Sequence, residues 1–165
     1  MRRQGNQRPY VALGADHNGV ALKRSLTRAL RQRHYRVLDL GTHSTHAVDY
    51  PDIARALGHA VLRRRADLGI LICGSGVGAS VAANKIPGIR AGLCHDVFSA
   101  RQSREDDDVN LLCLGAHVVG EKLAGEIVAA WLGARFSGAR RHRRRLQKIV
   151  RLEAEARMGR TQARS

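Results

Sequence analysis

The sequence predicts an α/β fold: a Rossmann-like three-layer sandwich with a five-stranded parallel sheet and a further helix at the C-terminal end. Two observations lead to this prediction. Apolar, strand-forming runs alternate five times with segments whose apolar residues recur at helical spacing. The run 68–73 is apolar at nearly every position, as expected of a parallel strand buried on both faces. Five strands in about 125 residues favour the flavodoxin-like strand order 2-1-3-4-5.

The individual elements follow from the same pattern. We expect strands at residues 10–15, 35–40, 68–73, 89–94 and 109–114, and helices at residues 20–33, 49–65, 77–85, 98–104, 121–132 and 140–158. Pro51 is well placed in the first turn of its helix. The acidic run 105–108 is expected to end the helix that precedes it.

The charge of the chain is concentrated at its ends. Of the net charge of +15, residues 1–9 carry +3 and residues 134–165 carry +9. Such basic segments could bind nucleic acid or anionic substrates, or they could simply reflect an Arg-rich composition without a partner. We expect one domain at residues 10–158, between a basic N-terminal tail, 1–9, and a basic C-terminal tail, 159–165.

Composition also argues against several classes of protein. No apolar run is long enough to cross a membrane, and the first ten residues lack the apolar stretch of a secretory signal. The cysteines, at 73, 94 and 113, have the spacing of neither a disulfide framework nor a zinc site. We therefore expect a protein of the reducing cytoplasm that does not associate with membranes.

The segment most suggestive of chemistry is Cys73-Gly74-Ser75-Gly76-Val77-Gly78. A buried strand delivers the thiol to the carboxyl edge of the sheet, and a helix begins just beyond it. N–H groups at a helix start hold anions and favour a thiolate, so Cys73 is a candidate for proton transfer. Ser75 would either steady an oxyanion or cap the helix. The alternative is a structural cysteine followed by a packing turn.

Other polar residues are expected at the same edge. Ligands of such sheets bind beyond the carboxyl ends of the strands, at the switch between strands one and three, which brings Asp16 and His17 near Cys73. These two could bind sugar hydroxyls or move protons. Otherwise Asp16 caps the next helix and His17 is simply exposed. Tyr50 could bind or pack, and His95 also ends a strand.

The densest basic run lies in the last predicted helix. Arg141 and Arg145 are four residues apart and share one helix face. Two neighbouring guanidinium groups suit a phosphate. A solvated basic helix and a nucleic-acid tail remain alternatives.

In addition, the chain resembles the ribose-5-phosphate isomerase B group, which contains the galactose-6-phosphate isomerase subunits. The resemblance covers about residues 10–150. It rests on Gly14-Ala15-Asp16-His17, Asp39-Leu40-Gly41-Thr42, Asp49-Tyr50-Pro51, the run from Gly69 to Gly78, Ala82-Ala83-Asn84-Lys85, Gly88-Ile89-Arg90-Ala91, and Arg141-His142 with Arg145.

The resemblance implies an aldose–ketose isomerase of phosphorylated sugars that works through a cis-enediol, without metal or cofactor. Cys73 would move the proton between C1 and C2. Asp16 and His17 would bind the sugar, and Arg141 with Arg145 the phosphate. The enediolate would be held by Ser75 and by the loop N–H groups of Gly74, Gly76, Val77 and Gly78. Family members are dimers or tetramers with sites at subunit interfaces, so the arginines are expected to serve a neighbour's site.

Three positions depart from the family pattern. The family reads Ser-Arg-Glu-His-Asn where this chain has Ser-Arg-Glu followed by Asp106 and Asp107. Asp106 therefore replaces the imidazole credited with ring opening, Asp107 the amide that assists the oxyanion, and His117 an arginine that helps bind substrate. His95 is a candidate substitute for ring opening. A tetrose 4-phosphate, which cannot close a furanose ring, would need no such imidazole.

Two other classes of function compete with the isomerase. Residues 74–79 fit the dinucleotide pattern G-x-G-x-x-A, with Asp96 about twenty residues further on, but no residues remain for a substrate domain. The basic ends lack the interleaved aromatics of a nucleic-acid binder, which makes nucleic acid an unfavoured partner. We predict an isomerase of the ribose 5-phosphate type, with a tetrose 4-phosphate or a hexose 6-phosphate as alternative substrates.

Overall fold

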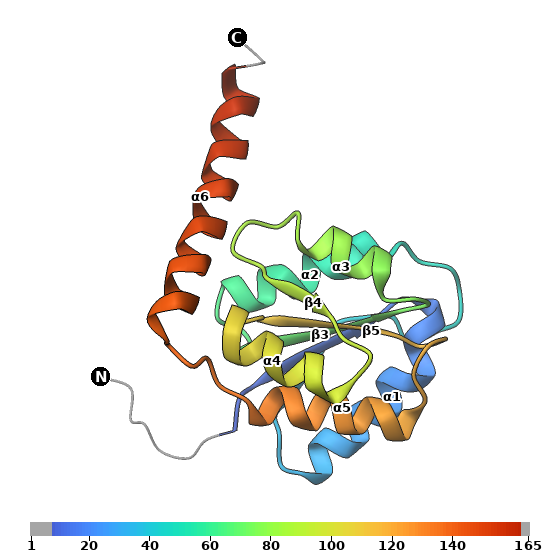
Figure 1. Cartoon of the computed structure of the whole chain (residues 1–165). Coiled ribbons are helices and arrows are strands. Elements are labelled where there is room, and N and C mark those ends of the chain that lie inside the picture. Colours follow the sequence, from blue (N-terminus) through green and yellow to red (C-terminus); the bar gives the residue numbers. More distant parts are fainter. Residues whose placement is uncertain (1–7, 163–165) are drawn as a thin grey trace.

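The computed structural model describes residues 8–162 and contains a five-stranded parallel sheet between two layers of helices (Figure 1). The predicted fold class is confirmed. In chain order the elements are β1 (Val11–Ala15), a 3-10 turn η1 (His17–Gly19), α1 (Val20–Gln32), β2 (Val37–Asp39), α2 (Tyr50–Leu62), β3 (Leu68–Cys73), α3 (Val77–Ala83), β4 (Ala91–Leu93), α4 (Val97–Asp107), β5 (Leu111–Gly115), α5 (Glu121–Gly133) and α6 (Arg140–Gln162).

The strand order is β2-β1-β3-β5-β4, so the last two strands are exchanged relative to the expected order. β5 pairs with β3, and Gly115 lies opposite Cys73 in the register. The burial of the two strands explains the exchange. All five residues of β5 are buried, whereas the three residues of β4 are half-buried or exposed, as suits an edge.

The direction of each crossover decides which face its helix covers. The connections from β1 to β2 and from β4 to β5 run the same way along the sheet, whereas those through α2 and α3 run the opposite way. Because such crossovers are right-handed, opposite directions place helices on opposite faces. Accordingly α5 packs against α1 and α4 on one face, and α2 packs against α3 on the other.

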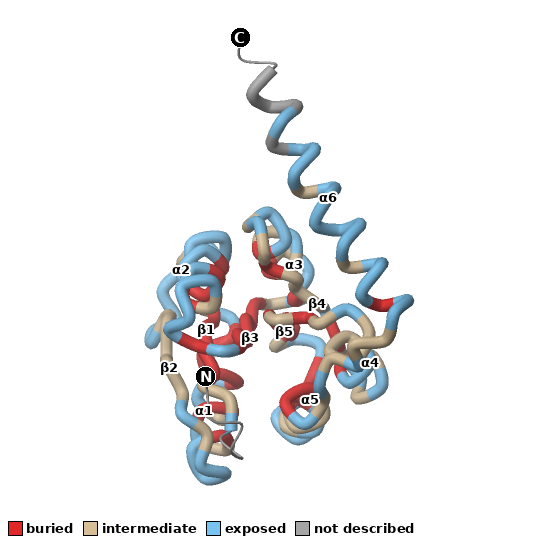
Figure 2. Tube along the Cα trace, turned by 90° about the vertical axis from the view of Figure 1, so that its left-hand side faces the viewer, coloured by how far each residue is buried: buried red, intermediate tan, exposed pale blue. Residues whose placement is uncertain are grey.

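The core has one apolar cluster on each face of the sheet. Trp131, Ile127 and Leu114 belong to the cluster under α1, α4 and α5, and Leu57, Leu71 and Cys113 to the cluster under α2 and α3. The central strands β1, β3 and β5 are buried throughout, and most of α6 is exposed (Figure 2). No helix within residues 8–162 is both long and apolar enough to cross a bilayer.

Several helix ends differ from the expected bounds: α2 and α3 end earlier, at Leu62 and Ala83, and two helices continue well past their expected ends. α4 continues through the first three acids of the run 105–108 and ends only at Asp108, whose φ is +46°. The helix tolerates these acids because Asp106 contacts His142 and Asp108 binds two arginines. α6 continues to Gln162, past its expected end near residue 158.

The boundary of the N-terminal segment also shifts. The Arg8 guanidinium lies 4.9 Å from the centre of the Tyr35 ring and donates to the Arg33 carbonyl oxygen. Residue 8 is therefore part of the folded body. The remainder of the predicted basic tail, residues 1–7, lies outside the described residues, as do residues 163–165.

Candidate active site at the carboxyl edge of the sheet

The carboxyl ends of β1 and β3 lie side by side, as the topological rule predicts. The Asp16 backbone N–H donates to the Ile72 carbonyl oxygen at 3.0 Å, which ties the turn after β1 to the end of β3. Asn18 lies near the glycine loop as well, because a Cβ added to Gly74 would be 3.6 Å from its amide nitrogen. The turn after β1 therefore lies beside the end of β3 and the first residue of the glycine loop.

Cys73 is the last residue of β3, and its side chain is 4% exposed. The Gly76 backbone N–H donates to the Cys73 Sγ at 3.1 Å. Gly76 has a φ of +80°, which turns the chain back so that this N–H meets the sulfur. An N–H directed at a sulfur stabilises negative charge on it. The loop therefore directs a backbone hydrogen-bond donor at the Cys73 sulfur.

The other two cysteines have different surroundings. Burial raises the pKa of Cys94, although the Ser103 hydroxyl counteracts this in part. Burial also raises the pKa of Cys113, with the neighbouring Cys73 and Cys94 adding to the shift. Both side chains therefore remain neutral thiols at physiological pH, and neither receives a backbone N–H among the described residues.

Ser75 and Tyr50 make structural contacts. The exposed Ser75 hydroxyl oxygen accepts the Val77 N–H at 3.2 Å, so it caps the start of α3. The Tyr50 ring packs against Gly78, where an added Cβ would lie 2.7 Å from the ring carbon Cζ. Packing is thus realised for Tyr50, and helix capping for Ser75. Both side chains remain partly accessible at the rim of the loop.

Asp16 and His17 have separate tasks in the turn after β1. Asp16 is buried, and its carboxylate accepts the N–H groups of Asn18 and Gly19 at 2.9 and 3.2 Å, so it caps η1. The half-buried His17 accepts the Val48 N–H on its Nδ1 at 3.3 Å. A groove of about 490 Å³ runs from His17 toward residues 43–46. His17 therefore faces accessible space, whereas the Asp16 carboxylate is already occupied.

Two more imidazoles follow β4 and β5. His95 Nε2 accepts the Gly115 N–H at 2.9 Å. His117 is exposed, and its backbone N–H donates to the Gly74 carbonyl oxygen at 2.9 Å. Both residues thus contact segments next to Cys73, which was expected of His95 as a residue that ends a strand.

Arg141 and Arg145 do not join this cluster. They lie exposed near the start of α6, which follows α5 at the amino edge of the sheet and then leads away from the body (Figures 1 and 2). The two edges are separated by the length of β3, six residues or about 20 Å. One chain therefore carries the predicted thiol and the predicted phosphate ligands at opposite edges.

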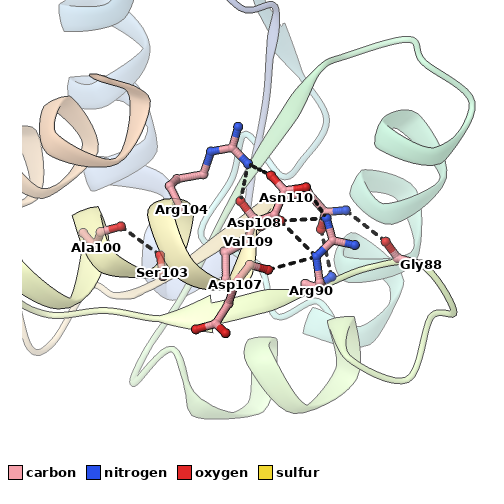
Figure 3. A network of polar contacts seen from close by, with 9 residues as sticks. All are labelled: Gly88, Arg90, Ala100, Ser103, Arg104, Asp107, Asp108, Val109 and Asn110. Atoms are coloured by element: carbon pink, nitrogen blue, oxygen red, sulfur yellow. Dashed lines mark hydrogen bonds and ion pairs between the residues drawn. The ribbon is translucent and has the colours of Figure 1, made fainter. Parts of the chain in front are cut away.

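The acidic run lies with the arginines at the amino edge. Asp106 Oδ1 is 3.4 Å from Nδ1 of the buried His142, in α6. Asp108 bridges Arg90 and Arg104 at 2.9 and 2.6 Å (Figure 3). The Asp107 carboxylate makes none of these contacts. Only the Asp107 backbone oxygen joins the network, by accepting from Arg90 at 3.1 Å (Figure 3).

A cavity of about 680 Å³ lies between β4, α4 and α6, and the loop after Cys73 is not among the residues that line it. Among the residues that line it are Leu93, Asp107, Ile149 and Leu152. It is an open groove lined in part by Arg90 and Cys94, and it is separate from the Cys73 thiol.

One structural residue went unnoticed in the sequence. Lys23 is 1% exposed and binds the Asp39 carboxylate and the Gly41 carbonyl oxygen, which fixes the loop after β2. A usable signal was present, since Lys23 falls on the apolar stripe of α1 between Val20 and Leu26. The backbone N–H groups of Gly115 and Val48, which bind His95 and His17, could not be found from the sequence, because backbone donors have no sequence signature.

Comparison with known proteins agrees with this arrangement. A model of the Ribose/Galactose Isomerase family matches residues 11–149. Ribose-5-phosphate isomerase B of Escherichia coli is 46% identical over 143 residues, which are 87% of this chain and 95% of that protein. D-erythrulose-4-phosphate isomerase of Pectobacterium atrosepticum is 42% identical over 129 residues, which are 78% of this chain and 85% of that protein.

A solved structure agrees as closely. Ribose-5-phosphate isomerase B of Clostridium thermocellum superposes with a TM-score of 0.87 at 47% identity, covering 89% of this chain and 99% of that one. Fold and relatives together define an enzyme of the aldose–ketose isomerase class. The chain belongs to the Ribose/Galactose Isomerase family.

Proposed function

We propose that this protein interconverts a phosphorylated aldose and its ketose, of the ribose 5-phosphate and ribulose 5-phosphate type, through a cis-enediolate with Cys73 as the base. The observation that carries the proposal is the N–H of Gly76 on the Cys73 sulfur. With this donor on its sulfur, Cys73 as the thiolate can remove the C2 proton of the aldose and return it to C1. The loop N–H groups and the Ser75 hydroxyl then lie where they can stabilise the enediolate oxygens.

The polar groups around the loop suit a sugar. His17 faces a groove, and Asn18 and His117 lie near Gly74. We assign sugar binding to His17 and Asn18, whose side chains line that groove, and His117 lies exposed beside them. The buried Asp16 orients His17 through the turn it caps, which differs from the direct contact expected from the family resemblance.

We further propose that the active site is shared between two copies of the chain. Arg141 and Arg145 are cationic ligands for phosphate, but they lie about 20 Å from the thiol of their own chain, judged by the length of β3. A second copy could place its arginines over the carboxyl edge of the first. Exposed apolar residues of α6, such as Val150 and Leu152, leave surface for such a contact.

Hybrid assemblies test the sharing. Cys73→Ala and the double variant Arg141→Ala with Arg145→Ala each inactivate every site of a homodimer. When the two proteins are dissociated and reassembled together, a hybrid has one intact site. About a quarter of the wild-type activity should return, because random pairing makes about half of the dimers hybrid. Mixtures that stay as inactive as their components would show that one chain supplies both halves.

A tetrose 4-phosphate is the second candidate substrate. Asp106 replaces the imidazole that the family uses for ring opening, and one relative is a D-erythrulose-4-phosphate isomerase. The C4 oxygen of a tetrose 4-phosphate carries the phosphate, so this substrate cannot form a furanose ring. For such a substrate the reaction needs no ring-opening imidazole, so the carboxylate at position 106 does not slow it.

A panel of sugar phosphates tests the proposed function. The purified protein is assayed for aldose–ketose conversion of ribose 5-phosphate, erythrose 4-phosphate and hexose 6-phosphates, without added cofactor. Turnover of at least one of them is expected, and its ranking by kcat/KM identifies the substrate. Absence of turnover on the whole panel would overturn the proposal. The three unpaired cysteines suit the reducing cytoplasm, where we place the reaction.

A further inference from the structure

Three imidazoles follow strands of the sheet at the edge where the glycine loop lies. His17 follows β1, His117 follows β5 and His95 follows β4. Two of them are already engaged. His17 accepts the Val48 N–H on Nδ1, and His95 accepts the Gly115 N–H on Nε2. A neutral imidazole has one acceptor nitrogen, and in each of these two rings that nitrogen already accepts a backbone N–H.

His117 differs from both. A Cβ added to Gly74 would lie 3.1 Å from its Cδ2 and 3.4 Å from its Nε2, so the ring edge lies over the residue that follows Cys73. The side chain is exposed. Within residues 8–162, neither ring nitrogen makes a hydrogen bond to the protein. His117 thus has a free acceptor and a free donor, beside the thiol, facing solvent.

The substrate itself creates a need for such a group. Ribose 5-phosphate closes to a furanose through its C4 hydroxyl, and Cys73 can act only on the open aldehyde. Asp106, at the position of the family's ring-opening imidazole, is a carboxylate whose Oδ1 already lies 3.4 Å from Nδ1 of the buried His142, so the imidazole is missing even where a second copy brings this edge to the site. His95, the substitute expected from the sequence, has its Nε2 bound to Gly115.

We propose that His117 opens the sugar ring, which gives the protein a sugar-phosphate anomerase activity that is separable from isomerisation; this inference rests on the proposed function. The neutral imidazole removes the proton from the C1 hydroxyl. The C1–O1 double bond forms as the C1–O4 bond breaks, and the electron pair of that bond goes to O4. The imidazolium then gives its proton to O4, which leaves the open aldehyde and a neutral imidazole.

Anomeric exchange without isomerisation tests the role directly. Cys73→Ala removes the base for C2 but keeps the imidazole. With ribose 5-phosphate labelled with carbon-13 at C1, exchange NMR measures interconversion of the α and β anomers, which passes through the open aldehyde. Cys73→Ala should accelerate this exchange above the protein-free rate. His117→Gln in the same background should lower the protein-catalysed rate of anomeric exchange about a hundredfold, the low end for loss of a general acid–base.

Matched variants separate the possible causes. His59→Gln, in the same background, changes an exposed imidazole on α2 and should leave the exchange unchanged. Asp106→Asn should also leave it unchanged. If Cys73→Ala fails to accelerate exchange, if His117→Gln leaves the acceleration intact, or if Asp106→Asn removes it, the assignment to His117 is wrong.

Substrate choice gives a second readout in the otherwise native protein. His117→Gln should lower kcat/KM for ribose 5-phosphate about a hundredfold and for erythrose 4-phosphate by less than about threefold, since a tetrose 4-phosphate has no furanose to open. Equal losses on both would overturn ring opening. Failure of the proposed function is distinguishable, because the wild-type protein would then convert neither sugar.

Discussion

Gly76→Ala should weaken both the fold and the site, and its effect can be worked out from the structure. Gly76 has a φ of +80°, and an L residue in this left-handed region costs about 1–2 kcal/mol. The new Cβ would lie 2.9 Å from the Leu114 carbonyl carbon and 3.0 Å from the Gly115 nitrogen. Both are backbone atoms of the central strand β5, so they cannot rotate away as a side chain would.

Overpacking of this kind costs about 1–3 kcal/mol, which brings the total loss to about 2–5 kcal/mol. Whole domains are stable by only about 5–15 kcal/mol, so the loss should be plain in equilibrium unfolding. With a urea m-value of about 2 kcal/mol/M, the midpoint falls by about 1–2.5 M. The displaced N–H should also leave the Cys73 sulfur, so kcat falls in the fraction that remains folded.

Urea unfolding followed by far-UV circular dichroism measures the first effect, and kcat in the absence of urea measures the second. Gly125→Ala is the matched control. Gly125 lies within α5 and an added Cβ meets nothing within 4 Å, so this variant should be more stable by about 0.5–1 kcal/mol. A Gly76→Ala protein with the wild-type midpoint and kcat would refute the role given to this turn.

Three further predictions follow from the same contacts. Arg141→Ala and Arg145→Ala should each weaken binding by about 1.5–3 kcal/mol, measured as a rise in KM on the order of 10- to 100-fold; unchanged KM values would leave the pair as a solvated basic face. Asp96 caps α4 at Ser99 N, and hydrogen bonds to Ser99 lower the pKa of its carboxyl, so its stabilising effect is present above its ordinary value of 3.8 and disappears as the pH falls through the lowered pKa. Asp96→Ala should therefore have a lower Tm than wild type near neutral pH, and a difference that persisted unchanged in strong acid would contradict this. Removal of residues 1–7 should leave Tm and activity unaltered, whereas removal of Arg8 as well should lower Tm through loss of its contacts to Tyr35 and Arg33; equal Tm values for the two truncations would contradict the boundary.

Local pattern and topology together predicted the main lines of the fold. The run Leu68–Cys73 is apolar on both faces, and it forms the central strand β3 with the expected bounds. The alternation of strands and helices then fixed the class of fold, and the switch-point rule brought Asp16 and His17 to Cys73. These inferences needed no knowledge of side-chain contacts.

What depended on contacts between distant segments could not be predicted in this way. Alternation does not say whether a crossover skips a neighbouring strand, so the exchange of β4 and β5 went unseen. The acidic run 105–108 was expected to end its helix, because the contacts of Asp106 with His142 and of Asp108 with Arg90 and Arg104 have no sequence signal. Likewise, only the folded chain reveals that Gly76 donates to the sulfur and that the arginines lie at the opposite edge. Capping by Asp16, in contrast, was already one of the two alternatives drawn from the sequence.

The central claim is that Cys73 moves the proton, and turnover by three single variants tests it most directly. Cys73→Ala, Cys94→Ala and Cys113→Ala are assayed for kcat on the sugar phosphate that the wild-type protein converts fastest. Cys73→Ala should lose at least about a hundredfold, because the C2 proton has no base. Cys94→Ala and Cys113→Ala should keep kcat within about threefold, because buried thiols with raised pKa values take no part in proton transfer. Near-normal turnover by Cys73→Ala would contradict the account.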